Sequence, residues 1–181
     1  MNPSLDLLSH QTQRHIWHLG ADVDTDALAP GAYMQHGIEV VAEHCLETLL
    51  PDFARDVQRG DVIVAGPNFG IGSSREQAAQ ALVFLGVEAV IAPSYSGLFF
   101  RNAFNVGLLL LTCSDIELLQ NEKLLAIDIQ RLQLILTDKS TLSCEPIPDF
   151  LLKMAQAGGL LAMLRQRPYS HQPTKIRKEP S

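Results

Sequence analysis

The sequence predicts an α/β fold whose core is a parallel sheet, with additional antiparallel strands. Three short apolar runs, "GDVIVAG", "VEAVIA" and "LLLLTC", are typical of strands covered on both faces, and a helical pattern separates each from the next. Strand, helix, strand, helix, strand implies parallel pairing with right-handed crossovers. The later stretch "LAIDIQRLQLILTD" alternates apolar and polar residues, which indicates antiparallel strands with one face in water.

Apolar residues at helical spacing predict the helices that accompany the parallel strands. The first covers Ile38 to Leu50, ahead of the first strand. The second runs from about Ser74 to Leu85, with Gly86 as a left-handed C-terminal cap. A third, short helix lies in "SGLFFRNAFNVG" and closes at Gly107.

Two further helices follow the parallel strands. "SDIE", Ser114 to Glu117, has the spacing of a capping box and starts a short helix. A last helix runs from Asp149 to Arg165, with Leu161 among its inward residues. Its Gly158-Gly159 pair costs about 1 kcal/mol per glycine relative to alanine, so we expect close packing or a kink there.

One domain, residues 14-165, accounts for the body of the chain, and we expect flexible ends at 1-13 and 166-181. The net charge is −6 and no basic stripe runs through the body, so we expect no nucleic acid and no membrane as partner. Neither a signal peptide nor a membrane span is visible, which predicts a cytoplasmic protein.

The three cysteines are scattered along the chain at Cys45, Cys113 and Cys144, without C-x-x-C spacing. This spacing disfavours a disulfide framework, a zinc site and a self-contained iron–sulfur cluster. We therefore expect no metal bound by this chain, and each cysteine as a small core hydrophobe.

The stretch "NFGIGSSREQAA" joins a predicted strand to a predicted helix, and it admits two interpretations. Ser73-x-x-Glu76 and Ser74-x-x-Gln77 both match a capping box, which satisfies the free amides of a helix and needs no function. Capping, however, requires neither the two glycines upstream nor Arg75 in the first turn, where the helix dipole disfavours a cation.

A ligand site explains those extra residues. Glycines at 70 and 72 let the backbone approach a ligand, helix N-terminal amides point at anions, and Arg75 can hold a carboxylate bidentately. A serine in such a corner could act as a base, because amide donors and a nearby cation stabilise an alkoxide. A nucleotide fits poorly, since "GIGSSR" lacks the third glycine of a dinucleotide fingerprint and the lysine of a P-loop.

Upstream, "ADVDTDALAP" carries aspartates at 22, 24 and 26, as a calcium loop does. Ala27 and Tyr33 stand where such a loop needs glycine and glutamate, so turn-forming hydrogen bonds are the better interpretation. In the loop that follows, Tyr33, Gln35 and His36 could line a pocket, although a lone His36 is more typical of a solvated surface. Arg101 could pair with a local acid or face the same cleft.

Four stretches together resemble the swivel domain of the aconitase superfamily. They are "DVDTDALAP", "VIVAGPNFGIGSSREQAAQAL", "VIAPSYSGLFFRNAFNVGL" and "LLKMAQAGGL", and the resemblance covers about residues 17 to 165. Within that superfamily the chain is most similar to the short, archaeal-like small subunits of 3-isopropylmalate dehydratase.

The resemblance implies a swivelling β/β/α domain that closes over a separate large subunit, which carries a [4Fe-4S] cluster. Ser73 resembles the serine that takes the carbon-bound proton of the substrate, and Ser74 and Arg75 resemble the groups that hold its carboxylate. Gly72 and the loop residues Tyr33, Gln35 and His36 are the other expected substrate contacts. The implied reaction is isomerisation of a hydroxy-dicarboxylate by dehydration and rehydration. The first expected substrate is isopropylmalate, in leucine biosynthesis.

The chain departs from the family pattern at two places. Gln77 stands where the family usually has histidine, and "YMQH" stands where isopropylmalate enzymes have tyrosine, leucine, a basic residue and threonine. Homoaconitate, dimethylmalate and methylmalate-type acids therefore stay open as substrates. Two other classes also stay open, namely a non-catalytic anion-binding module and a phosphate-binding protein.

Overall fold

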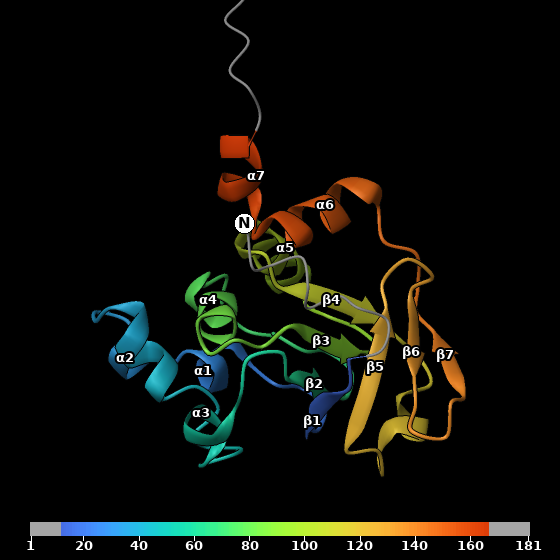
Figure 1. Ribbon diagram of the computed structural model, residues 1–181. Helices are drawn as coiled ribbons and strands as arrows, with labels where there is room; N and C mark the ends of the chain where they lie inside the picture. Colours follow the sequence, from blue (N-terminus) through green and yellow to red (C-terminus); the bar gives the residue numbers. More distant parts are fainter. Residues whose placement is uncertain (1–11, 167–181) are drawn as a thin grey trace, which may run out of the picture.

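The computed structural model describes residues 12–166 (Figure 1). The domain predicted at 14-165 lies within this range. The predicted flexible ends, 1-13 and 166-181, lie outside the described residues apart from Thr12, Gln13 and Gln166.

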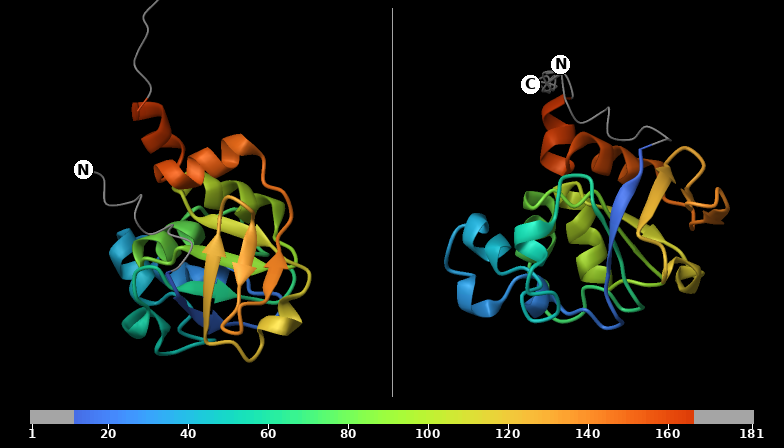
Figure 2. Two further views of the ribbon diagram at one scale, coloured as in Figure 1. Left: turned by 45° about the vertical axis from the view of Figure 1, so that its right-hand side comes forward. Right: turned by 60° about the horizontal axis from the view of Figure 1, so that its bottom comes forward.

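One curled sheet organises the described part of the chain, with seven strands in the order β4-β3-β2-β1-β5-β6-β7. Neighbours among the first four strands pair in parallel, and the remaining pairs are antiparallel, which confirms the predicted fold class. The left view of Figure 2 shows β5, β6 and β7 standing in front of the parallel strands. The strands are β1 (Arg14–His18), β2 (Val62–Val64), β3 (Ala89–Ala92), β4 (Leu109–Thr112), β5 (Leu124–Asp128), β6 (Gln133–Ile135) and β7 (Thr141–Ser143).

The sequence interpretation missed strand β1, although β1 joins the two halves of the sheet. It pairs in parallel with β2 and antiparallel with β5. Its sequence "RHIWH" does not match the pattern of a buried strand, because Arg14 is charged and yet buried. That charge is compensated only in the folded chain. The Arg14 guanidinium donates two hydrogen bonds of 2.7 Å to the carboxylate of Glu88, which is 74 residues away.

Helices pack beside the sheet and against one another (Figure 1). Contacts link α2 to α4, α4 to α5, and α5 to α6 and α7. None of the helices in residues 12–166 is long and apolar enough to cross a membrane. The helices are α1 (Thr25–Leu28), η1 (Gly31–Tyr33), α2 (Ile38–Glu43), α3 (Phe53–Asp56), α4 (Gln77–Phe84), α5 (Gly97–Val106), η2 (Ile116–Leu119), α6 (Asp149–Ala157) and α7 (Leu160–Gln166).

Several predicted helix boundaries are wrong, each for a local reason. The helix expected to reach Leu50 ends at Glu43, because the chain turns and Leu46 adopts a left-handed φ of 60°. "SDIE" leads into a 3₁₀ turn without a side-chain cap. The C-terminal end of α5 is as predicted, since Gly107 is a left-handed cap with a φ of 89°.

The Gly158-Gly159 pair divides the last predicted helix into α6 and α7. Both glycines have positive φ, 82° and 103°. A Cβ on Gly159 would lie 2.4 Å from the carbonyl oxygen of Asn105, so α5 packs against bare backbone here. Close packing and a break therefore both occur. Leu161, predicted to face inward, is 70% exposed because the break turns α7 outward.

Candidate functional site

The two serines lie in the loop between β2 and α4, and they do not cap the helix. Helix α4 begins at Gln77, its N-cap is Glu76, and no side chain caps it, so the capping-box interpretation is wrong. The loop instead binds the segment before α1: the amide of Gly70 donates to the carbonyl of Val23 at 2.7 Å, and the amide of Thr25 donates to that of Ile71 at 2.8 Å. Two loops thus build the site together.

The glycines of the loop are required by packing. Gly70 has a φ of 78°, and a Cβ there would lie 2.2 Å from Cγ of Phe99 on α5. Gly72 has a φ of 103°, and its Cβ would lie 3.0 Å from Oγ1 of Thr25. Such φ values favour glycine, so the sequence fixes the path of this loop against its neighbours.

We call residues 72–75 together with Thr25 and Asp26 the serine corner. Ser73 is held from both loops: its amide donates to Thr25 Oγ1 at 3.0 Å, and the two hydroxyl oxygens lie 3.4 Å apart. On the other side, Arg75 Nε donates to Ser73 Oγ at 2.7 Å. Helix α5 supports the next residue, because Asn102 Nδ2 donates to the carbonyl oxygen of Ser74 at 3.0 Å.

Arg75 lies one residue before the N-cap of helix α4, and Asp26 compensates its charge at the amino end of that helix. Its Nη1 donates to Asp26 Oδ1 at 2.8 Å and to the carbonyl oxygen of Ala29 at 2.7 Å. The Arg75 hydrogen bond, with help from the amide of Gly31, lowers the pKa of Asp26 below its ordinary value. The carboxylate is therefore charged near neutral pH and holds the guanidinium in place.

This anchoring changes the predicted contact between Arg75 and a carboxylate. Nε and Nη1 of Arg75 already donate to partners inside the chain. Nη2 is the guanidinium nitrogen that has no hydrogen bond to residues 12–166. A bidentate grip by Arg75 alone is not available in this arrangement. A substrate carboxylate would be shared between Nη2 and neighbouring donors of the corner.

The arrangement favours negative charge on one oxygen. A hydrogen bond from a cation to an alkoxide is stronger than one to a neutral hydroxyl, so the Nε–H of Arg75 stabilises the ionised form of Ser73. Gly72, Ser73 and Ser74 are exposed, while Arg75 is partly buried, with 21% of its side chain accessible. Ser73 is therefore both bonded to a cation and accessible from outside the chain.

The loop after α1 is tied to the corner at its start only. The amide of Gly31 donates to Asp26 Oδ1 at 3.0 Å, but within residues 12–166 no hydrogen bond joins the side chains of Tyr33, Gln35 or His36 to the corner. Tyr33 stacks on His44 with ring centroids 3.6 Å apart. Gln35 and His36 are exposed. These three residues lie near the corner along the chain but stay predicted contacts.

Of the aspartates of "ADVDTDALAP", Asp24 and Asp26 accept local backbone hydrogen bonds, as predicted, whereas Asp22 bonds to a residue 46 positions away. Asp22 accepts from Asn68 Nδ2 at 2.9 Å, and Asp24 caps α1 by accepting from the amide of Ala27 at 2.7 Å. Asp26 does more than turn the chain, since it holds Arg75. Sequence reasoning missed this role and that of Asn102, although the motif of three aspartates was visible.

Arg101 has no ion pair with any residue in the described range, so the local pairing, one of its two expected roles, is wrong. Its side chain is exposed on α5, in the residue next to Asn102, which bonds the corner. A role of Arg101 toward the cleft stays a prediction.

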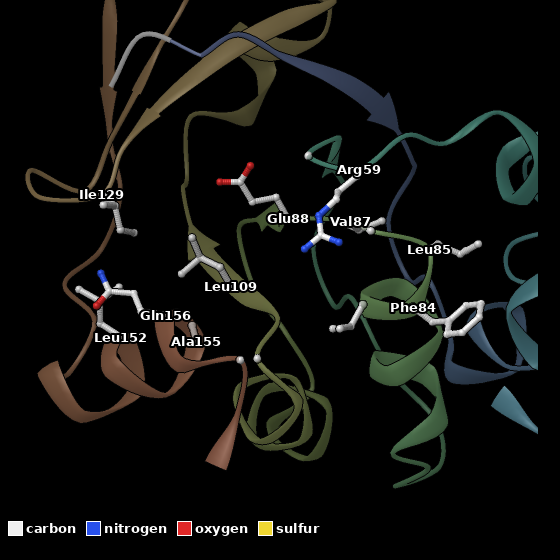
Figure 3. Close-up of a pocket in the computed structure, with 15 residues that line it drawn as sticks. Arg59, Phe84, Leu85, Val87, Glu88, Leu109, Ile129, Leu152, Ala155 and Gln156 are labelled. Carbon is white, nitrogen blue, oxygen red and sulfur yellow. The ribbon is translucent and has the colours of Figure 1, made fainter. Parts of the chain in front are cut away.

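A cavity of about 300 Å³ lies elsewhere, at the amino ends of β3 and β4 (Figure 3). Figure 3 shows Leu152 and Ala155 of α6 on one side of it and Phe84 at the end of α4 on the other. Its one carboxylate, Glu88, is already bonded to Arg14. The ends of α4, α5 and α6 that border it present carbonyl groups, which disfavour an anion.

The serine corner is the better candidate site. It follows the carboxyl end of β2, and loops at the carboxyl ends of parallel strands are where open α/β sheets bind ligands. Neither the cavity of Figure 3 nor a second hollow beside Tyr95 and Phe100 includes a residue of the corner. Residues 72–74 of the corner are exposed instead on the surface of the described part of the chain.

Comparisons with known proteins agree on one family. Residues 29–116 match the family described as Aconitase C-terminal domain. A 3-isopropylmalate dehydratase small subunit of Archaeoglobus fulgidus is 42% identical, over 83% of this chain and 97% of that protein. The methanogen homoaconitase small subunit of Methanocaldococcus jannaschii is 41% identical, over 82% of this chain and 88% of that one.

A solved structure shares the fold. The crystal structure of a 3-isopropylmalate dehydratase from Methanocaldococcus jannaschii superposes with a TM-score of 0.77 at 37% sequence identity. The match covers 84% of this chain and 92% of that one. The similarity therefore includes nearly the whole described part and is not confined to the serine corner.

Proposed function

Because this chain belongs to the family of 3-isopropylmalate dehydratase small subunits, with the fold of the aconitase C-terminal domain, we propose that it is the small subunit of a heteromeric hydro-lyase. The reaction removes water from a hydroxy acid and adds it back with the hydroxyl group on the neighbouring carbon. The first substrate pair is 2-isopropylmalate and 3-isopropylmalate, in leucine biosynthesis. The observation that supports this most directly is the 2.7 Å hydrogen bond from Arg75 Nε to Ser73 Oγ.

Ser73 is the proposed base. Dehydration requires removal of a proton from carbon, and a serine hydroxyl forms an alkoxide base near neutral pH only if the alkoxide charge is stabilised. Arg75 supplies a cation at hydrogen-bond distance, and Asp26 keeps that cation oriented through a 2.8 Å contact. Ser73 Oγ would accept the proton, hold it as a hydroxyl, and return it in the rehydration step.

Arg75 and Ser74 are the proposed contacts for a substrate carboxylate. Nη2 of Arg75 has no hydrogen bond to residues 12–166, and the Ser74 hydroxyl is exposed. The amide of Gly72 lies in the same exposed loop. Tyr33, Gln35 and His36 would meet the substituent that distinguishes one malate derivative from another.

The metal chemistry would belong to the partner. Within the described residues no three His, Cys, Asp or Glu side chains form a group that could hold a metal ion, so this part of the chain offers no ligand set for a cluster. A [4Fe-4S] cluster on a large subunit would supply a Lewis acid for the substrate hydroxyl. The exposure of the serine corner is consistent with a site that two chains complete.

Reconstitution tests the proposal. The chain is combined with the large subunit of its own organism, and conversion of 2-isopropylmalate is followed by chromatography. We expect no turnover by the isolated chain, turnover by the complex, and loss of turnover in Ser73→Ala with unchanged unfolding free energy. Ser114→Ala is the matched control, because Ser114 is also exposed and makes no side-chain hydrogen bond within residues 12–166.

Full activity of Ser73→Ala would refute the catalytic role of Ser73. Absence of both a partner and turnover would favour a non-catalytic anion-binding module. Homoaconitate is the second candidate substrate, for two reasons. The loop at Tyr33 to His36 departs from the pattern of isopropylmalate enzymes, and the chain is 41% identical to a homoaconitase small subunit. Comparing kcat/KM for both acids in one complex decides between them.

A further inference from the structure

The two edges of the curled sheet meet at one hydrogen bond. Strands β4 and β7 are the outermost strands in the sheet order. At the last residue of β4 and just beyond β7, the amide of Glu145 donates to the carbonyl oxygen of Thr112 at 2.8 Å. β4 runs parallel to β1, and three antiparallel pairings in succession make β7 run opposite to β1. The two edges therefore meet in antiparallel orientation.

This bond places Cys113 and Cys144 directly opposite each other. In an antiparallel pairing, the residue after Thr112 faces the residue before Glu145. The amide of Cys113 donates away from the meeting line, to Ala92 at 3.1 Å, and the amide of Cys144 donates away from it, to Leu132 at 2.8 Å. The cysteines are thus a non-hydrogen-bonded pair, in which Cα atoms lie about 4.5 Å apart and side chains share one face.

The two thiols also influence each other's ionisation. Interaction with the Cys144 side chain is the main cause that lowers the pKa of Cys113 to about 7, helped by the Asp115 amide and opposed by burial and by the Asp115 charge. The same interaction raises the pKa of Cys144. A fraction of Cys113 is therefore ionised near neutral pH.

We propose that Cys113 and Cys144 form a redox modification site, in which hydrogen peroxide converts the free pair into an intrachain disulfide. The expected Cα separation falls within the range of about 4.4–6.8 Å that a disulfide spans. Both cysteines are free in this structure. Cys113 is buried, whereas Cys144 is partly exposed, so a molecule as small as peroxide reaches the pair from the Cys144 side.

The chemistry balances with peroxide as the oxidant. The thiolate attacks one peroxide oxygen, the O–O bond breaks, hydroxide leaves and a sulfenic acid forms. The sulfur of the second cysteine then attacks that sulfur, the S–O bond breaks and water leaves with the thiol proton. The hydroxide takes the proton lost in forming the thiolate. Two thiols and one peroxide thus give one disulfide and two waters.

The test uses the full chain, reduced and then treated with hydrogen peroxide. Free thiols are titrated in denaturant, and peptides are mapped without reduction. We expect the number of free thiols to fall from three to one, and the remaining thiol to be Cys45. Closing a loop on the order of 30 residues should raise Tm by about 10 °C, and reductant should reverse the rise.

Matched variants separate the pair from general thiol oxidation. Cys113→Ser and Cys144→Ser should each lose the cross-link and the Tm rise, whereas Cys45→Ser should keep both, since Cys45 lies in the core away from the meeting line. Three free thiols after treatment, or a cross-link that includes Cys45, would overturn the proposal. Mapping of the unmodified chain gives this answer even if a variant does not fold, and it requires no dehydratase activity.

Discussion

Asp26 offers a sharp test of how the serine corner works, because its contact with Ser73 runs through Arg75. Replacing Asp26 by alanine removes the 2.8 Å anchor of Nη1 and leaves Arg75 its backbone bond to Ala29. The Nε bond to Ser73 then loses its fixed direction. A hydrogen bond to a charged group contributes about 1.5–3 kcal/mol, so kcat of the reconstituted complex should fall about 10- to 150-fold.

Stability should respond much less than activity. The Asp26 side chain is 66% exposed, and ion pairs at such positions contribute about 0.2–1 kcal/mol to the unfolding free energy. Urea unfolding of the isolated chain measures this value, and kcat and KM are measured in the complex. Asp56→Ala is the matched control: it breaks an ion pair of 2.8 Å with Arg55, outside the corner, and should leave kcat unchanged.

The variant Asp26→Asn and the pH dependence of kcat test the same role of Asp26 in two further ways. Asp26→Asn keeps an oxygen acceptor without charge, so its kcat should lie between those of the wild type and Asp26→Ala. Because Arg75 lowers the pKa of Asp26, the carboxylate contributes above its ordinary pKa and is lost only as pH falls through the lowered value. The ratio of wild-type to Asn kcat should therefore be constant between about pH 5 and pH 8.

A double-mutant cycle decides whether Asp26 acts through Arg75. If it does, Asp26→Ala combined with Arg75→Lys should cost less than the product of the two single effects, since both remove the same oriented donor. Unchanged kcat in Asp26→Ala, or full additivity with Arg75→Lys, would refute the reasoning. Either result would show that Asp26 does not orient Arg75 toward Ser73.

Three further predictions concern the support of the corner. Gly70→Ala should destabilise the chain by about 2–4 kcal/mol in urea, because its Cβ would meet Phe99, whereas Gly97→Ala, with open space around it, should change stability by less than about 1 kcal/mol. Asn102→Ala should cost about 1–2 kcal/mol in urea and also lower kcat, because it removes a buried donor to the corner. Gln35→Ala should leave stability within about 0.5 kcal/mol but change the kcat/KM ratio between isopropylmalate and homoaconitate; an unchanged ratio would remove Gln35 from the substrate contacts.

Sequence reasoning worked best where one local pattern decides the structure. The apolar runs of β2, β3 and β4 are buried, so their parallel pairing follows from the apolar runs and the helical patterns between them. Gly86 and Gly107 adopt the left-handed φ of 89° expected after a helix, because only glycine adopts it without cost. The cost of glycine inside a helix separately predicted close packing or a kink at Gly158 and Gly159.

Sequence reasoning failed where a residue far away along the chain determines the local structure. Strand β1 was missed because the charge of Arg14 is compensated by Glu88, and no local pattern records that pair. The serines matched a capping box, yet helix α4 starts at Gln77 because the loop before it bonds to the segment at Val23 to Thr25.

The sequence by itself determined that a serine, a second serine and an arginine stand together after a buried strand, with glycines that fix their loop. Only the tertiary structure decided what each atom of that group faces. Asp26 lies 49 residues from Arg75 along the chain but within 2.8 Å in space, and it turns Nε toward Ser73. Likewise, the curl of the sheet brings Cys113 and Cys144 opposite each other. Such pairs depend on the sum of many folded contacts, which no short stretch of residues contains.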